Sequence, residues 1–219
     1  MNDTAKRLKL DRVIGREVSE RKYYNLIGLN LGYGLIVNML MVAFLGDSVR
    51  HINMLVFLLI YFASAFAGIA LMASSNNVVT SFIGYNMVVL PVGTLLAIAL
   101  PSYNLNNIAF AFIEALAITF IMIVISNVKP NVFRKMGSAL LTALIGFVIV
   151  ELLLLIFGFD LMLMDIIAVG IFTLLIGYDW AVAQDYHKSS VTAILVASSL
   201  YLDVINLFLR LLNIRSKDW

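Results

Sequence analysis

The sequence predicts an all-α fold, a bundle of seven helices that cross a membrane. Hydrophobic residues make up 62% of the 219 positions, charged residues only 13%, and the mean hydropathy is +0.99. Soluble domains carry about 25% charged residues, so this composition indicates an integral membrane protein. The apolar residues also fall into runs of about 20, the length that a helix needs to cross roughly 30 Å of hydrocarbon.

The predicted helices follow one another with only short polar breaks, none of which is long enough to form a domain outside the membrane. They are expected at residues 23–46, 52–73, 78–100, 108–128, 136–158, 162–186 and 191–214. We therefore expect a basic cytoplasmic tail at 1–22, one membrane domain at 23–214 and a short C-terminal tail at 215–219.

Small residues and one proline mark the first three runs. Gly28 and Gly32 form a G-x-x-x-G pattern in the first run, and Gly68 continues a small-residue stripe in the second. Such residues allow neighbouring helices to approach closely. Pro91 removes one donor from the third run, so the freed backbone carbonyl is expected to line a cavity or to pack.

The positions of Lys and Arg predict a cytoplasmic N-terminus. This orientation puts eleven of these residues on the cytoplasmic side and four on the other, as the positive-inside rule requires. The short loops and the lack of a removable signal peptide are typical of a bacterial plasma membrane protein. The basic tail is explained by this rule, so no nucleic-acid partner is expected.

The sequence contains no signature of an enzyme. It lacks cysteine, a phosphate-binding glycine loop and the G-x-S-x-G and H-E-x-x-H motifs, which excludes thiol chemistry and predicts no catalytic residue and no cofactor. An intramembrane aspartyl protease pairs "YD" with "GxGD", whereas the second aspartate here stands in "YLD". We therefore predict that the protein is not an enzyme.

Apart from Asp185, which begins a polar break, five acids fall within the predicted helices, and each costs roughly 2.5–3.5 kcal/mol at a helix centre. Asp165 is near the outer end of its helix and is expected either to meet water or to act as an N-terminal helix charge. Glu151 is deeper, and either a hydrogen bond to a neighbouring helix or a place in an ion pathway accounts for it. The remaining three are Glu114, Asp179 and Asp203.

Asp179 and Asp203 are the strongest candidates for function. They are 24 residues apart, and their midpoint, residue 191, lies at the polar turn between the last two predicted helices. Two antiparallel helices turning there would bring both carboxylates to one depth, about 18 Å from the turn and near the bilayer middle. We expect them to face each other, with the seventh helix surrounded by the others.

Two carboxylates in a low-dielectric site share a proton, because both cannot be ionised cheaply. When deprotonated they repel and offer up to four oxygens to a cation, and Asn206 lies one turn from Asp203 to supply another. The alternative is that the two acids bond separately to hydroxyl groups such as those of Tyr178 and Tyr201 and only specify packing.

Three segments resemble the Bax inhibitor-1 family of transmembrane proteins. "IGYDWAVAQ" at 176–184 and "SLYLDVINLFLRLL" at 199–212 are similar to its last two helices, and "EALAITFIMIVIS" at 114–126 is similar to its fourth. The resemblance implies a seven-helix calcium leak controlled by pH through Asp179 and Asp203, with Glu114 lining the outer mouth. The run at 52–73 lacks the arginine that latches the pH sensor in some bacterial members. Either Arg210 replaces it, or the closed state depends on the shared proton alone.

The sequence therefore predicts a calcium-permeable, pH-sensitive leak in the lipid bilayer. Asp179 and Asp203 are the predicted sensor, gate and metal ligands, and calcium is the expected permeant ion. Glu114, Glu151 and Asn206 are the predicted ion pathway. Two other functions stay open, a proton-coupled cation transporter and a non-conducting modulator of a membrane quality-control protease.

Overall fold

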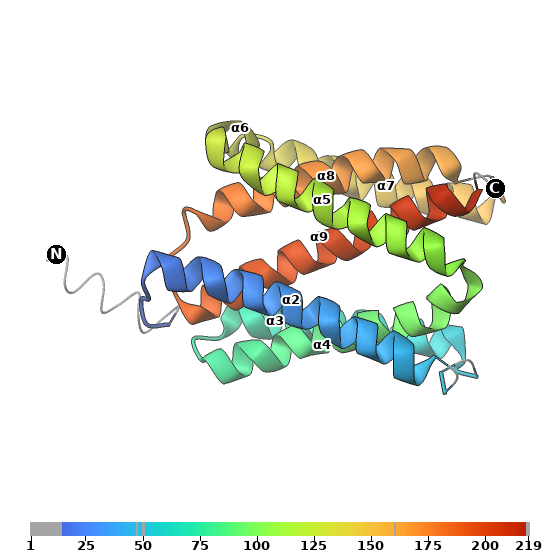
Figure 1. Ribbon diagram of the computed structural model, residues 1–219, viewed down its shortest axis with the longest axis horizontal. Helices are drawn as coiled ribbons and strands as arrows, with labels where there is room; N and C mark the ends of the chain where they lie inside the picture. The colour runs from blue at the N-terminus through green and yellow to red at the C-terminus, as the bar shows by residue number, and fades with distance from the viewer. Residues whose placement is uncertain (1–14, 47, 50, 160, 218–219) are drawn as a thin grey trace, which may run out of the picture. The chain divides into compact units, whose positions relative to one another are not determined.

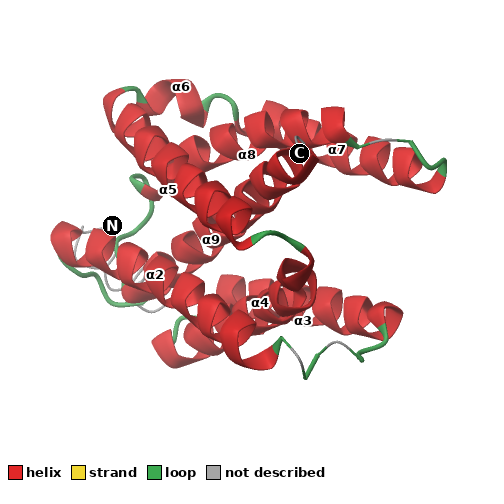
Figure 2. Cartoon of the chain, turned by 45° about the vertical axis from the view of Figure 1, so that its right-hand side comes forward, coloured by secondary structure: helices red, strands yellow, loops and turns green. Residues whose placement is uncertain are grey.

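The computed structural model describes residues 15–46, 48–49, 51–159 and 161–217. Their regular secondary structure is helical, with short loops between the helices (Figure 2), apart from an isolated antiparallel bridge between Glu17 and Ser189. The helices are α2 (Glu20–Leu45), α3 (Met54–Ser74), α4 (Val78–Ala99), the 3-10 turn η1 (Leu100–Ser102), α5 (Leu105–Val128), α6 (Pro130–Arg134), α7 (Gly137–Ile156), α8 (Met162–Ala183) and α9 (Ser190–Lys217).

Seven of these helices are long and apolar enough to cross a membrane, which confirms the predicted fold class. Most of the predicted basic tail, residues 1–14, lies outside the described residues. Its last three residues already belong to α2, and α9 continues to Lys217 through most of the predicted C-terminal tail. The short helix α6 occupies the predicted loop between the fourth and fifth spans.

Polar residues in the loops begin several of the helices. The side chains of Ser19, Asn53, Asn77 and Asn104 each accept a hydrogen bond from a backbone N–H of the first turn of α2, α3, α4 and α5. These first-turn N–H groups have no partner within the helix, so an N-cap side chain satisfies them where the chain enters the membrane.

The described helices form two compact units. The first contains α2, α3, α4, η1 and the chain from Tyr186 to Tyr201, and the second contains the chain from Tyr103 to Asp185 and from Leu202 onward. Helix α9 supplies its first half to one unit and its second half to the other. It is also the most buried span, since 78% of its apolar window is buried against 11% in α3 and in α7.

In the first unit, α4 packs against both α2 and α3 (Figure 1). The closest approach is between Gly68 of α3 and Gly84 of α4, where a Cβ on either glycine would collide with the other's backbone carbonyl. The expected close packing at Gly28 and Gly32 is not seen, because a Cβ at either position would meet nothing within 4 Å in this chain. The small-residue pattern therefore predicted the α3 contact correctly and the α2 contact wrongly.

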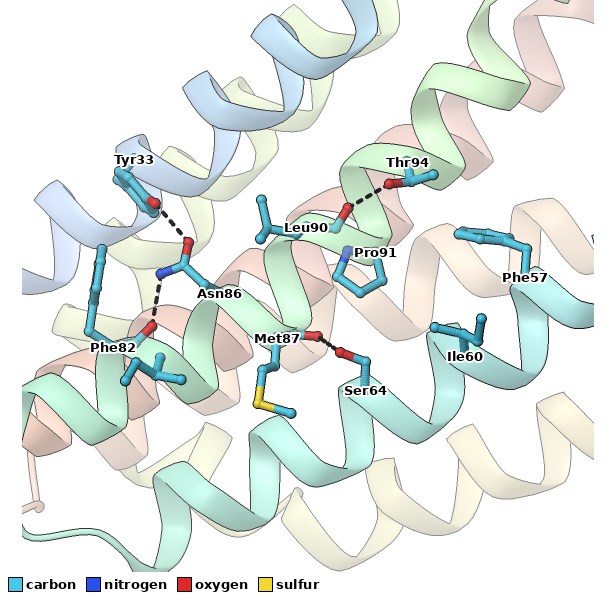
Figure 3. Close-up of a pocket in the computed structure, with 11 residues that line it drawn as sticks. Tyr33, Phe57, Ile60, Ser64, Phe82, Asn86, Met87, Leu90, Pro91 and Thr94 are labelled. Carbon is cyan, nitrogen blue, oxygen red and sulfur yellow. Dashed lines mark hydrogen bonds between the residues drawn. The ribbon is translucent and has the colours of Figure 1, made fainter. Parts of the chain in front are cut away.

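Pro91 of α4 lies beside a groove of about 750 Å³ lined by residues of α2, α3 and α4. The Ser64 hydroxyl of α3 donates a 2.7 Å hydrogen bond to the Met87 carbonyl, which Pro91 leaves without a helical donor (Figure 3). Tyr33 donates a 2.7 Å bond to Asn86 at the same groove. The carbonyl freed by the proline thus lines a groove and is satisfied there by a neighbouring helix.

In the second unit, α8 packs against α5, α6 and α7. Ser126 of α5 donates a 2.7 Å hydrogen bond to the Gly177 carbonyl of α8, and both residues are buried. A Cβ on Gly177 would lie 2.7 Å from Cδ1 of Phe133, so only glycine allows α6 to approach α8 this closely. These contacts fix the part of α8 that carries Asp179.

Candidate functional site

Asp203 is the most unusual acid of the chain because it is buried without full hydrogen bonding. It lies in the second half of α9 and is 8% exposed. Among the described residues, no hydrogen-bond donor reaches its buried Oδ2 atom. An unsatisfied carboxylate oxygen in an apolar interior carries a large desolvation cost, which marks the position as a functional candidate.

Asp179 of α8 belongs to the same compact unit as Asp203. It is half-buried. The neighbouring end of α8 is held by several polar contacts. Trp180 and Gln184 donate to the Asn127 side chain at 2.9 and 3.2 Å, and Arg134 lies 2.6 Å from Asp185. Asp179 therefore stands on a segment of α8 that α5 and α6 hold in place.

The two aspartates do not lie at matching distances from the turn, so that part of the spacing argument was wrong. Helix α8 ends at Ala183 and α9 begins at Ser190. Asp179 is therefore about 6 Å from its helix end, and Asp203 is about 20 Å from its own. The six connecting residues extend to about 20 Å, which covers the difference of about 14 Å. A long connection, rather than a symmetric turn, lets the two acids interact.

Arg210 bonds to two acids of neighbouring helices. Its guanidinium donates two hydrogen bonds to Glu151 of α7, one of them at 2.9 Å, and one of 3.0 Å to Asp165 of α8. The arginine also lies over the Phe147 ring, 5.2 Å from its centroid. We call Arg210, Glu151 and Asp165 the Arg210 cluster. It ties α7 and α8 to α9 by charge-assisted hydrogen bonds.

Asp165 is the buried acid of this cluster. It lies in the first turn of α8, which agrees with the expected N-terminal helix charge, and its burial rules out the alternative that it meets water. Its side chain is 2% exposed, and the Lys217 ammonium lies 3.8 Å from Oδ2. The Asn213 side-chain amide also donates to Asp165 at 3.4 Å, and Tyr103 donates a 2.6 Å bond to the side-chain oxygen Oδ1 of Asn213. Asp165 is buried because α9 supplies its partners in place of water.

Glu114 of α5 has a separate partner. Arg215 donates to both of its carboxylate oxygens, one bond being 3.1 Å, and stacks 5.1 Å from the centre of the Phe110 ring. This ion pair is more open than the Arg210 cluster, because the two side chains are 32% and 40% exposed. All three neighbouring spans of the second unit are therefore joined to α9 by an ion pair.

The sequence-predicted site residues thus divide into two groups. Asp179 and Asp203 belong to one compact unit and their pairing stays a prediction, whereas Glu114 and Glu151 are held by arginines and Asn206 bonds to the Leu202 carbonyl at 2.8 Å in its own helix. Arg210 bonds to Glu151 and Asp165. Its role as a latch for the aspartates stays a prediction, as does the pathway role of the other three residues.

A signal for the Arg210 cluster was present in the sequence. Asp203, Arg210 and Lys217 recur every seven residues and therefore share one face of α9. The predicted topology also places three acids and three cations toward the same side of the membrane. They are Glu114, Glu151, Asp165, Arg210, Arg215 and Lys217. Pairing them by charge would have found Asp165.

The described residues do not bring together enough side-chain ligands for a metal site. Within the part of the chain that the structure describes, no group of three or more His, Cys, Asp or Glu side chains is arranged to hold a metal ion. Asp179 and Asp203 supply two carboxylates, and calcium takes six to eight oxygens. A bound cation would need water and carbonyl oxygens in addition.

The profile of a protein family described as "Inhibitor of apoptosis-promoting Bax1" matches residues 16–218. The chain belongs to the Bax inhibitor-1 family. The match includes the first two spans, which lie outside the three segments that carried the resemblance.

Bacterial relatives resemble this family member over nearly their whole length. YrjE of Lactococcus lactis, described as uncharacterized, is 30% identical over 208 residues, which cover 88% of each chain. An uncharacterized membrane protein of Streptococcus pyogenes serotype M3 is 28% identical over 211 residues, 90% of this chain and 91% of its own. A protein of serotype M1 matches to the same extent. The relatives and the seven apolar helices identify this Bax inhibitor-1 family protein as an integral membrane protein.

Proposed function

We propose that this protein is a calcium-permeable leak whose opening depends on pH through Asp179 and Asp203. The observation that carries the proposal is the burial of Asp203 beside a second carboxylate, with one oxygen that no donor in the described chain satisfies. Burying an acid that only supports packing costs free energy without a gain in function. An acid that exchanges a proton as part of the mechanism accounts for that cost.

The proposed switch uses the proton shared by the two carboxylates. With the proton present, one carboxyl donates to the other and α8 and α9 stay together. When the proton leaves, two like charges in a low-dielectric site repel each other and draw in a cation. The leak is therefore closed at low pH and opens as pH rises.

Glu114 and Glu151 enter the proposal as acids that attract calcium, but only after their arginines move. In the structure Arg215 and Arg210 already neutralise them. A conducting state would exchange these tethered cations for the permeant ion. The same observation favours a second candidate function, a non-conducting modulator of other membrane proteins such as a quality-control protease, because that role needs no free acids.

A proton-coupled cation transporter uses the same aspartates and differs from a leak in one measurable way. A transporter moves protons against the cation, whereas a leak does not. We further propose that the protein resides in a bacterial plasma membrane with its N-terminus in the cytoplasm, since eleven of its Lys and Arg residues then lie inside.

Calcium flux into liposomes that contain only this protein tests the proposal. Calcium entry, followed by the fluorescence of a calcium indicator dye trapped inside, should become faster as the external pH increases. Its rate should be proportional to the protein content. Flux that is absent at every pH, from protein shown to be folded by its thermal melting, would favour the non-conducting modulator. A matching proton flux in the opposite direction would favour the transporter.

A further inference from the structure

The N-terminal end of α2 carries a shallow hollow of about 360 Å³ on its surface. Ser19, Arg21, Lys22, Asn25, Leu26 and Leu29 line it. Arg21, Lys22 and Asn25 are exposed, and Leu29 is 69% exposed. The hollow thus joins two cations and an amide to an apolar surface on one membrane-spanning helix.

The order of these residues along α2 matches the order of groups in a phospholipid. The cations stand at the first turn, Asn25 follows one turn deeper, and Leu29 is eight residues beyond Arg21, about 12 Å along the axis. A polar head at the membrane surface and an apolar chain beneath it would meet cations first and leucines second.

The charges at this end favour an anion. No carboxylate within the described residues holds the side chains of Arg21 and Lys22. Glu20, the acid of the same turn, lies 3.8 Å from the Lys188 ammonium, which offsets its charge. The N-terminus of α2 adds a partial positive charge. A phosphate at the hollow would therefore gain charge-assisted hydrogen bonds.

We propose that this hollow binds an anionic phospholipid, with the phosphate on Arg21, Lys22 and Asn25 and an acyl chain along Leu26 and Leu29. The site is separate from the aspartates and does not depend on ion conduction. It fastens the N-terminal end of α2 to the anionic surface of the membrane, where each basic residue contributes to binding.

Native mass spectrometry of the full-length protein in mild detergent tests this inference with phosphatidylglycerol as the probe. The variant Arg21→Gln with Lys22→Gln should bind the first phosphatidylglycerol about 30-fold more weakly, which is about 2 kcal/mol at 1.4 kcal/mol per tenfold. Phosphatidylcholine should bind both proteins equally, because its net charge is zero. Both substituted side chains are exposed, so the variant should melt at the wild-type temperature.

A matched control removes two other exposed cations, Lys129 and Lys135, from the loop that the predicted topology places on the same side of the membrane. Lys129→Gln with Lys135→Gln should leave phosphatidylglycerol binding within about twofold of wild type. Equal losses in both double variants would mean diffuse attraction to charge and would overturn the site. Unchanged binding in the Arg21 and Lys22 variant would also overturn it.

A third arm separates the lipid from a free phosphate. Glycerophosphoglycerol, the headgroup without its chains, should not compete with phosphatidylglycerol, and Leu29→Gln should weaken lipid binding. Effective competition by the headgroup alone would show that the hollow binds a phosphate ester and not a lipid.

Discussion

Replacing Arg210 with methionine should destabilise the protein strongly. Methionine keeps the apolar part of the side chain over Phe147 but removes three hydrogen bonds, two to Glu151 and one to Asp165. It leaves two carboxylates that are 19% and 2% exposed. Breaking a buried ion pair by removing one partner costs about 3–5 kcal/mol.

The lower end of that range, about 3 kcal/mol, is the value we expect. Lys217 stays 3.8 Å from Asp165 and offsets part of the charge that Arg210 leaves behind. The assay is reversible unfolding of the purified protein by dodecyl sulfate in mixed micelles, followed by circular dichroism and tryptophan fluorescence.

The matched control is Arg215→Met, which breaks an ion pair of the same chemistry on the same helix. Arg215 and Glu114 are 32% and 40% exposed, so solvent screens their attraction and the loss should be at most about 1 kcal/mol. Neutralising both acids in the Arg210→Met background, as Glu151→Gln and Asp165→Asn, should recover much of the lost stability. Equal destabilisation by the two arginine variants would refute the reasoning, since burial would then not set the cost.

Two further predictions concern the first unit and use the same unfolding assay. Ser64→Ala should cost about 1–2 kcal/mol, because the carbonyl that the proline frees then has no donor; Thr94→Ala, whose hydroxyl bonds only within its own helix, should cost less than about 0.5 kcal/mol. An equal effect would contradict this. Gly34→Ala should cost about 1–3 kcal/mol, because its Cβ would lie 2.9 Å from Cδ2 of Tyr201. Gly28→Ala meets nothing within 4 Å and should be neutral or stabilising, so a comparable loss there would refute the packing argument.

The fold followed from the sequence because hydrophobic length alone decides where a helix crosses a membrane. The predicted span at 78–100 matches Val78–Ala99, and that at 108–128 matches α5 within three residues. The largest errors are at helix ends such as that of α8, where Ala183 is the last helical residue and not residue 186. Polar residues at a membrane surface favour helix and loop almost equally, so hydropathy leaves these ends undetermined.

Side-chain partners were harder to predict than spans. The pairing of Asp179 with Asp203 stays a prediction, and the symmetric turn from which it was inferred is not the geometry of the structure. The ion pairs of Arg210 with Glu151 and Asp165 of other helices were not anticipated, and its role as a latch for the aspartates stays a prediction. Periodicity along one helix places residues on a face, but it does not say which helix that face meets.

The pH profile of calcium flux in two single variants tests the central claim most directly. Asp179→Asn and Asp203→Asn each leave one acid beside a neutral amide, which hydrogen-bonds but cannot repel. Wild-type flux into liposomes should increase with pH, whereas both variants should show low flux that is flat or strongly displaced along the pH axis. Wild-type pH dependence in both variants, with normal thermal melting in detergent, would show that the two aspartates are structural and that the sensor lies elsewhere.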